Sequence, residues 1–524
     1  MSRALLYIYM CALVACGRSA PTPSTTGHPR LVVLVVIDQL SEDAFEPRAA
    51  AATDGVARLM KDGRRFLATY PYAATSTAPG HAALGTGAPP AVTGIISNEI
   101  WDRELAVVVD TTKGAKGPPT AARLRVDGIA DALLRAHPDA HAVAVAIKSR
   151  SALYTLGHSG VSVWYDADHL QMVSNTPRAW LDWLALLHPL APTMHDLWRA
   201  TDPARLATLS GSPDDAPGEL SLRGWTSTFP HAIGAGTQPH RAFESTPQAD
   251  VAITDAALAA IAAEHLGEDE IPDLLVVSFS AHDYVGHAFG PDSWESWDEW
   301  LRLDVQLGRI ERALDAAAPG AWTMIMTSDH GAPSTPEHRK ALGLPGLRMS
   351  YEDVADAAER GAESVAGPGP WIAAARYPSV WLTGTARALP PSVRDQLIDA
   401  AIKAIGSTPG IARAARTSEL AGSCDTRTGD DRGLCLSIDP ERSGEIVFLP
   451  AEGTIMAKRG DPDATDHGSL FDYDREVPLI VMGAGVTPSV VSGSVSPLAV
   501  APTLAALLGV PPPSAARERP LPLI

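Results

Sequence analysis

Short runs of apolar residues recur along the chain, with helical patterns between them. Residues 31–37 (LVVLVVI) form a continuous β-branched run, typical of a strand buried on both faces of a parallel sheet. Similar runs follow at residues 142–147, 274–280, 322–327 and 477–482. Helical patterns lie at residues 49–61, 121–136 and 297–317. This alternation predicts an α/β fold, a doubly wound and mostly parallel central sheet with helices on both faces.

Two long stretches interrupt this alternation. Residues 165–250 are rich in Trp, Pro and polar side chains, and residues 332–450 carry many Pro and Gly. We expect both to be insertions that form a cap over the sheet, rather than independent domains. Apolar residues make up 45% of the 524 residues, enough for a substantial core. We therefore predict one large domain over residues 31–524.

The N-terminus has the pattern of an export signal. Arg3 precedes an apolar run at residues 4–14, which is too short to span a bilayer comfortably. The run ends in Leu-Val-Ala-Cys16-Gly, which resembles the lipobox of bacterial lipoproteins. This predicts a signal peptide over residues 1–15, a membrane-attached lipid on Cys16, and a flexible tether over residues 16–30. The alternative is an ordinary secretory signal with a chance cysteine. Either signal exports the protein, and a lipoprotein would reside in the periplasm or at the cell surface.

The net charge bears on the class of ligand, and two further cysteines bear on covalent links within the chain. A formal charge of −19 without a basic stripe argues against nucleic-acid binding, so an anionic substrate would need local positive charge from metal ions or a few Lys and Arg. Cys424 and Cys435 lie close together in a Gly- and Asp-rich stretch. In an oxidising compartment they are most simply a disulfide closing a loop, and a metal site is less favoured because no second pair accompanies them. The sequence specifies no oligomeric state.

Six carboxylate and imidazole groups fall where the predicted strands end. Ligands of an open α/β sheet sit outside the carboxyl ends of its strands. Any one of these residues alone would more often be a cap, a turn former or a core histidine. Six at one edge divide into two triads, each leaving an open coordination position as catalytic zinc requires. The six are Asp38 after the first run, Asp283 and His287 after the third, Asp329 and His330 after the fourth, and His467 ten residues before the fifth.

The motifs around these residues resemble those of a known superfamily. In order they are IDQL, TAPGHAALGTG, NEIWD, IKSRSALYTLGHSG, DYVGH, SDHG and TDHGSLFDYDREVPLIVMGAG. They resemble the alkaline phosphatase superfamily, specifically its threonine-nucleophile (phosphate-irrepressible type) alkaline phosphatases, which are related to nucleotide pyrophosphatase/phosphodiesterases. The resemblance implies phosphate monoester hydrolysis through a phosphothreonine formed on Thr77, with two zinc ions per chain. It implies one zinc on Asp283, His287 and His467, and another on Asp38, Asp329 and His330, with Thr77 bridging towards the second.

The chemistry of threonine is consistent with that role. A threonine hydroxyl is a poor nucleophile at neutral pH unless a base or a metal favours the alkoxide. Thr77 precedes a predicted helix at residues 78–84, whose N-terminus would add a positive dipole and backbone N–H donors.

Three polar residues bear on the substrate class. Lys148 and Arg150 follow a predicted strand, and at i and i+2 of an extended chain they would project to one face. They suit the extra charged oxygens of a monoester, and Asn98 can donate to another phosphoryl oxygen. In the resembling family this Asn–Lys–Arg set marks monoesterases, whereas the diesterase relatives lack the Lys–Arg pair. We therefore expect small phosphorylated metabolites as substrates.

Several alternatives stay open at this point. Lys148 and Arg150 could merely solvate a strand end. The chain could be a phosphodiesterase/nucleotide pyrophosphatase of the same superfamily, or an inactive, metal-bound binding lipoprotein. A sulfatase is disfavoured because Thr77 is neither Cys nor Ser, and a phosphomutase because it would usually be cytoplasmic. For His81, His158 and His282 we expect hydrogen-bonding or packing roles.

Overall fold

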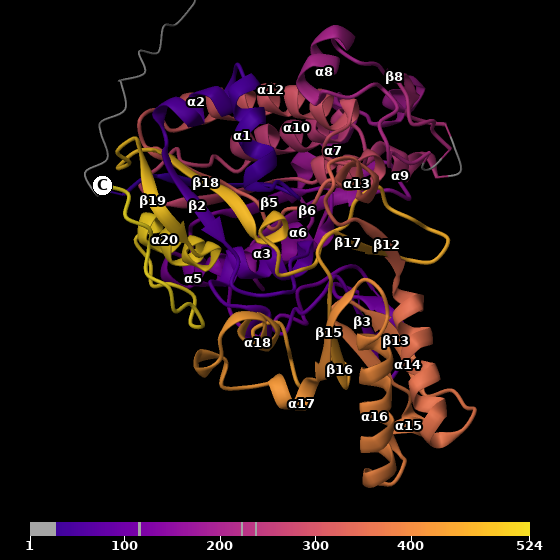
Figure 1. Cartoon of the computed structure of the whole chain (residues 1–524). Coiled ribbons are helices and arrows are strands. Elements are labelled where there is room, and N and C mark those ends of the chain that lie inside the picture. The colour runs from indigo at the N-terminus through magenta and orange to yellow at the C-terminus, as the bar shows by residue number, and fades with distance from the viewer. Residues whose placement is uncertain (1–27, 114–116, 222–223, 236–237) are drawn as a thin grey trace, which may run out of the picture.

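The computed structural model describes residues 28–113, 117–221, 224–235 and 238–524 (Figure 1). The predicted signal peptide, Cys16 and most of the predicted tether lie outside these residues. Within them, no helix combines the length and the apolar character needed to cross a membrane.

A mixed sheet forms the centre of the molecule. In the described part of the chain it has nine strands, in the order β19-β2-β18-β11-β1-β10-β5-β6-β7. The block from β11 to β6 is parallel, whereas β18 runs antiparallel to both β11 and β2. The strands are β1 (Leu31–Ile37), β2 (Arg64–Thr69), β5 (Ala142–Ala146), β6 (Val161–Asp166), β7 (Gln171–Ser174), β10 (Asp273–Phe279), β11 (Trp322–Thr327), β18 (Glu476–Gly483) and β19 (Ser489–Val495). All five predicted apolar runs are strands of this sheet, which confirms the predicted fold class.

Helices cover both faces of the sheet, and β1 shows why its sequence is uniformly apolar. Val32, Leu34 and Val36 belong to a core shared with one helical layer, and the alternate residues of β1 belong to a core shared with the other. All seven residues of β1 are fully buried. Figure 1 shows one layer above the sheet, with α1 (Glu42–Ala51), α2 (Gly55–Asp62), α10 (Pro247–Ala263) and α12 (Trp294–Ala317). The layer below contains α3 (Thr77–Thr86), α5 (Ile129–Ala136) and α20 (Val500–Leu508).

Two predicted helices differ from the structure. The helix predicted at residues 49–61 is divided into α1 and α2, because the carboxylate of Asp304 accepts the backbone N–H groups of Thr53, Asp54 and Val56 at 2.7–2.9 Å and so starts a new helix. The helix predicted at residues 121–136 is restricted to α5.

The two interrupting stretches pack differently. Trp180, Trp198 and Phe243, from the first stretch, join the core on one face of the central sheet. Residues 347–458 contain most of the second stretch, and we call them the cap module. It has its own core and a four-stranded sheet, and it projects from the lower right of Figure 1. Its elements include β12 (Leu347–Ser350), α14 (Tyr351–Ala366), β13 (Ile372–Arg376), β14 (Ser379–Leu382), α16 (Pro391–Gly406), β15 (Ile411–Arg416), β16 (Ile446–Pro450) and β17 (Thr454–Ala457).

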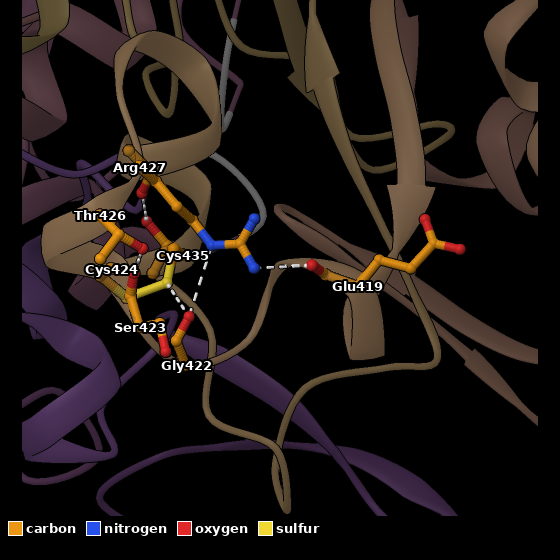
Figure 2. The surroundings of a disulfide bond; sticks show 9 residues. Glu419, Gly422, Ser423, Cys424, Thr426, Arg427 and Cys435 are labelled. Atoms are coloured by element: carbon orange, nitrogen blue, oxygen red, sulfur yellow. Dashed lines mark hydrogen bonds between the residues drawn. A yellow bond between two sulfur atoms is a disulfide. The ribbon is translucent and has the colours of Figure 1, made fainter.

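A disulfide joins Cys424 to Cys435 at the end of α18 (Gly429–Cys435), as Figure 2 shows. The Cα atoms are 5.5 Å apart, within the usual range for a bridge. Arg427, inside the loop, donates to the carbonyl of Glu419 at 2.7 Å and so fastens the loop to the preceding turn (Figure 2).

Candidate active site

The predicted metal-ligand residues meet at one edge of the central sheet. Asp38 directly follows β1, and Asp329 and His330 follow β11. Asp283 and His287 lie in α11 (Ala281–Phe289), which follows β10. These three strands are adjacent and parallel, so their carboxyl ends share an edge. His467 precedes β18, and it reaches the same edge because β18 runs antiparallel to β11.

The first group consists of Asp283, His287 and His467. One helical turn separates Asp283 from His287, so both side chains lie on one face of α11. His287 Nε2 lies 3.2 Å from Asp283 Oδ1, and His467 Nε2 lies 3.7 Å from the same oxygen. The three ligand atoms lie within 4.8 Å of one another, a spacing that can hold one metal ion.

The second group consists of Asp38, Asp329 and His330. His330 Nε2 lies 3.4 Å from Asp38 Oδ1 and 3.6 Å from Asp329 Oδ2. Among the described residues, Asp38 Oδ1 and His330 Nε2 are buried and have no hydrogen-bond partner. Asp283 also approaches this group, since ligand atoms of Asp38, Asp283 and His330 lie within 4.8 Å of one another. The two groups are therefore neighbours.

Each histidine of these groups is oriented by a backbone carbonyl. The Nδ1 atoms of His287, His467 and His330 lie 2.9, 2.8 and 3.0 Å from the carbonyl oxygens of Thr465, Thr75 and Gly331, respectively. A hydrogen bond at Nδ1 leaves Nε2 as the acceptor, which is how metal-binding histidines are commonly held. Mixed imidazole and carboxylate donors in sets of three fit zinc sites with an open coordination position.

Burial makes this cluster electrostatically costly without bound cations. Burial, with Asp283 and Asp329 adding to it, raises the pKa of Asp38 well above its usual range. Burial acts in the same direction on Asp283, but His287 and Lys148 outweigh it and hold the pKa of Asp283 well below the usual range. Burial lowers the pKa of His467 well below its usual range, which favours the neutral, metal-binding imidazole.

Thr77 is the first residue of α3 and is buried. Its hydroxyl is linked to both groups through the Lys148 ammonium, which contacts Thr77, Asp38 and Asp283. The close approach of α3 to the strand end depends on Gly80, because a Cβ there would lie 2.4 Å from the carbonyl oxygen of Asp329. His81 Nδ1 lies 2.9 Å from the carbonyl of Thr77 and 3.0 Å from Asp329 Oδ2, while Nε2 lies 3.0 Å from Ser278 Oγ. His81 thus connects the first turn of α3 to the ends of β10 and β11, a hydrogen-bonding role.

Lys148 and Arg150 reach the site differently from the predicted arrangement. The extended prediction is wrong because the chain turns into α6 (Ser149–Leu156) directly after β5, with Lys148 as its N-cap and Arg150 in its first turn. Lys148 is buried, and its Nζ donates to Asp38 Oδ2 at 2.6 Å, to Asp283 Oδ2 at 2.5 Å and to Thr77 Oγ1 at 3.2 Å. Arg150 Nη1 lies 3.4 Å from Asp110 Oδ2. Solvation of a strand end therefore does not describe Lys148.

Asn98 lies beside the start of α3. Its Oδ1 accepts the backbone N–H of Ala78 at 2.7 Å. This bond uses the carbonyl end of the amide and leaves the two N–H donors of Nδ2 for a ligand.

A cavity of about 310 Å³ lies between residues of the candidate site and residues of the cap module. Its inner wall includes Asn98, Arg150, His287 and His467. Its outer wall comes from the cap module and includes Tyr351, Arg376, Tyr377, Met456 and Lys458. Sequence reasoning missed these outer residues and Glu99, which also lines the cavity, because no motif marks them. The sequence could have indicated the cap-module residues only by their place in or beside an insertion, and Glu99 only by its place next to Asn98.

Comparison with known proteins identifies the family. The family model for type I phosphodiesterase / nucleotide pyrophosphatase matches residues 32–470, which is most of the chain. The chain belongs to this family. The predicted membership of the alkaline phosphatase superfamily is thereby confirmed.

Several similar proteins match nearly the whole chain. Alkaline phosphatase PhoD of Zymomonas mobilis is 29% identical over 525 residues, covering 94% of this chain and 88% of PhoD. Alkaline phosphatase PhoV of Synechococcus elongatus is also 29% identical, covering 94% of this chain and 92% of PhoV. A crystal structure of alkaline phosphatase PafA superposes with a TM-score of 0.85 at 24% identity, covering 96% of this chain and 99% of PafA. The last comparison establishes a shared fold.

Proposed function

We propose that this family member is an alkaline phosphatase-type hydrolase of phosphate monoesters, with Thr77 as its nucleophile and two zinc ions as cofactors. The buried Lys148 ammonium carries the proposal, because its Nζ lies 3.2 Å from Thr77 Oγ1. A monoester dianion presents one more anionic oxygen than a diester, and a cation beside the nucleophile is placed to meet it. The full-length relatives named alkaline phosphatase support this choice.

The residues of the site suggest how the reaction proceeds. Thr77 Oγ1 gives up its proton to solvent and attacks phosphorus, the bond from phosphorus to the leaving oxygen breaks, and that oxygen takes a proton from solvent. A water molecule then attacks the phosphothreonine, which releases phosphate and restores the Thr77 hydroxyl. Lys148, Arg150 and the Asn98 amide bind phosphoryl oxygens, aided by the N-terminus of α3.

Two groups of side chains would hold the zinc ions. Zinc bound there would supply Lewis acidity that favours the threonine alkoxide and an activated water, and it would offset negative charge in the transition state. The residues concerned are Asp283, His287 and His467 for one ion, and Asp38, Asp329 and His330 for the other.

An assay on three substrate classes tests the proposal. We expect purified, zinc-loaded protein to hydrolyse a phosphate monoester faster than a phosphate diester, and a sulfate monoester slowest. Faster turnover of the diester would favour the phosphodiesterase alternative, to which the family description itself refers. No turnover by a fully zinc-loaded sample would favour the inactive binding lipoprotein. The cavity of about 310 Å³ suits small phosphorylated metabolites.

The cellular setting and the domain plan are part of the same proposal. The protein would be an exported lipoprotein, held on a membrane by lipid on Cys16 and a tether reaching to residue 30. The Cys16→Ser variant should be released in soluble, active form, whereas a soluble wild-type protein with another mature N-terminus would refute the anchor. Residues 31–524 would form one catalytic domain, with residues 165–250 and 332–450 as cap insertions.

A further inference from the structure

The open end of one hairpin adjoins two of the proposed phosphate-binding residues. The hairpin pairs β3 (Glu99–Asp102) with β4 (Val107–Asp110), and Glu99 faces Asp110 at its open end. Asn98 directly precedes Glu99, and its carbonyl accepts the backbone N–H of Thr111 at 3.0 Å. Asp110 Oδ2 lies 3.4 Å from Arg150 Nη1. A shift of this open end would therefore move Asn98 and disturb Arg150 together.

The hairpin packs on the cap module. Ile100 on β3 joins the fully buried Trp381 of β14 in a small core. At the closed end, Arg103 donates to the carbonyl of Ser443 at 3.0 Å and pairs with Glu445 at 3.3 Å. The position of the hairpin is thus set by the cap module, although the residues next to its open end serve the catalytic edge of the central sheet.

Glu99 fastens the open end to the cap module with both carboxylate oxygens. Oε2 accepts from Arg376 Nε at 3.0 Å, and Oε1 accepts from Lys458 Nζ at 2.9 Å. Arg376 in turn lies over the ring of Tyr351, 5.2 Å from its centroid. Burial acts to raise the pKa of Glu99, but Lys458 and Arg376 outweigh it and hold that pKa below its usual value. Glu99 is therefore ionised at neutral pH.

We propose that Glu99 is a positioning residue for phosphate binding, and that its ion pairs with Arg376 and Lys458 hold the Asn98 amide and the Asp110–Arg150 contact in place from the cap module. This inference rests on the proposed function, because Asn98 and Arg150 act there as phosphate ligands. A displacement of about 1 Å in a positioning group can cost as much as about a hundredfold in rate, so a small movement of the hairpin is sufficient.

The test is a double-mutant cycle on the full-length, zinc-loaded enzyme. Glu99→Gln keeps the shape of the side chain and removes its charge. We expect kcat/KM for a monoester to fall roughly tenfold and the inhibition constant of inorganic phosphate to rise by a similar factor, with zinc content unchanged. In the Asn98→Ala, Arg150→Ala background, the same change should cost less than about twofold, because the positioned groups are already absent.

The matched control is Glu452→Gln. Glu452 belongs to the cap module and pairs with Arg339 of α13 (Pro336–Ala341) at 2.9 Å, away from the hairpin. This variant should keep kcat/KM within about twofold of wild type, because neither Asn98 nor Arg150 depends on that ion pair.

The outcomes separate this inference from the proposed function. Wild-type kcat/KM in Glu99→Gln, or an equal loss in both backgrounds, would overturn the positioning role. Wild-type monoesterase activity in the Asn98→Ala, Arg150→Ala variant would overturn the proposed phosphate site instead. If Glu99→Gln folds poorly, the pair Arg376→Gln, Lys458→Gln approaches the same contact from the cap module. If the loss of kcat/KM in this pair were the same in the wild-type and the Asn98→Ala, Arg150→Ala backgrounds, that result would also overturn the positioning role.

Discussion

The ammonium group of Lys148 lies 3.2 Å from the hydroxyl oxygen of Thr77. The same nitrogen donates to Asp38 and Asp283, one carboxylate from each proposed metal group. A single buried cation therefore contacts the proposed nucleophile and both groups at once. This arrangement means that charge compensation and phosphate binding cannot be altered independently at position 148.

The role proposed for Thr77 gives the most direct prediction. Thr77→Ala removes only the attacking oxygen, so it should reduce kcat by at least about a thousandfold while zinc content and the unfolding midpoint stay near wild type. Thr77→Ser keeps a hydroxyl and should retain partial activity. The measurement is steady-state hydrolysis of a monoester together with metal analysis, and an undiminished rate in Thr77→Ala would refute the mechanism.

Monoester preference should depend on the basic pair. Removing a charged partner from a buried contact costs roughly 2–5 kcal/mol. At about 1.4 kcal/mol per decade, this corresponds to about 30-fold to several-thousand-fold in rate. We expect the Lys148→Ala, Arg150→Ala variant to lose this much monoesterase activity, while any diesterase side activity changes far less.

The control for that variant is Lys340→Ala, which removes an exposed lysine from α13. Zinc must be measured on each sample, because Lys148 also contacts two carboxylates of the metal groups. Equal losses on monoester and diester at full zinc content would show that the pair has only a structural role.

Metal removal should abolish activity reversibly. Chelation should stop turnover, and added zinc should restore it. His467→Ala or Asp283→Ala should lower zinc content and activity together, since each removes a proposed zinc ligand. His158→Ala is a suitable control, because the His158 ring contacts Asp131 and the carbonyl of Leu124 instead of the metal groups. Two bound metals and a wild-type rate in either ligand variant would contradict the assignment.

The fold was predictable where local pattern and tertiary environment agree. The run at residues 31–37 is apolar at every position because helices cover both sides of β1. The break between α1 and α2 was not predictable, since it depends on the carboxylate of Asp304, 248 positions from Val56 in the sequence. The helical pattern of residues 49–61 does not by itself indicate that contact.

The candidate site was also predictable only in part from the sequence. The predicted ligands stand in short motifs, and the structure brings them to one edge of the central sheet. Lys148 and Arg150 were placed wrongly in detail, because their spacing does not reveal that a helix begins at Ser149. Glu99, Arg376 and Lys458 come from three segments that only the folding of the cap module brings together.

Stability should depend on pH through Glu311. This carboxylate lies buried on α12, 3.7 Å from Arg58 Nη1. Burial raises the pKa of Glu311 to about 8, and Arg58 only partly opposes the effect. An unfolded glutamate has a pKa of about 4.3, so between these values the folded protein binds the extra proton. The contribution of Glu311 to the free energy of unfolding is therefore present at low pH and lost as pH rises towards about 8.

Glu311→Gln removes this contribution, because glutamine stays neutral. The free energy of unfolding of the variant relative to wild type should increase from about pH 5 to about pH 9. Denaturant unfolding of both proteins at each pH measures the difference, and the pH dependence of metal binding cancels. A constant difference across the range would show that Glu311 is ionised in the folded protein.

The disulfide should stabilise a segment that supports the loop before Thr77. Gly433 and Ser437, next to Cys435, accept hydrogen bonds from the backbone N–H groups of Ala73 and Ala74 at 2.8–3.2 Å. Closing a loop of this length contributes about 2–3 kcal/mol in the chain-entropy model. The Cys424→Ser, Cys435→Ser variant should lose about that much free energy of unfolding.

The same variant separates stability from catalysis. Activity at low temperature should remain within about twofold of wild type, because the bridge lies outside the residues proposed to bind phosphate or metal. Heat inactivation should be faster, since the support behind residues 73–77 opens at lower temperature. A reductant should destabilise wild type to the level of the variant and leave the variant unchanged. If reductant and double substitution both left the free energy of unfolding at its wild-type value, the bridge would be absent from the folded protein or would contribute nothing to its stability.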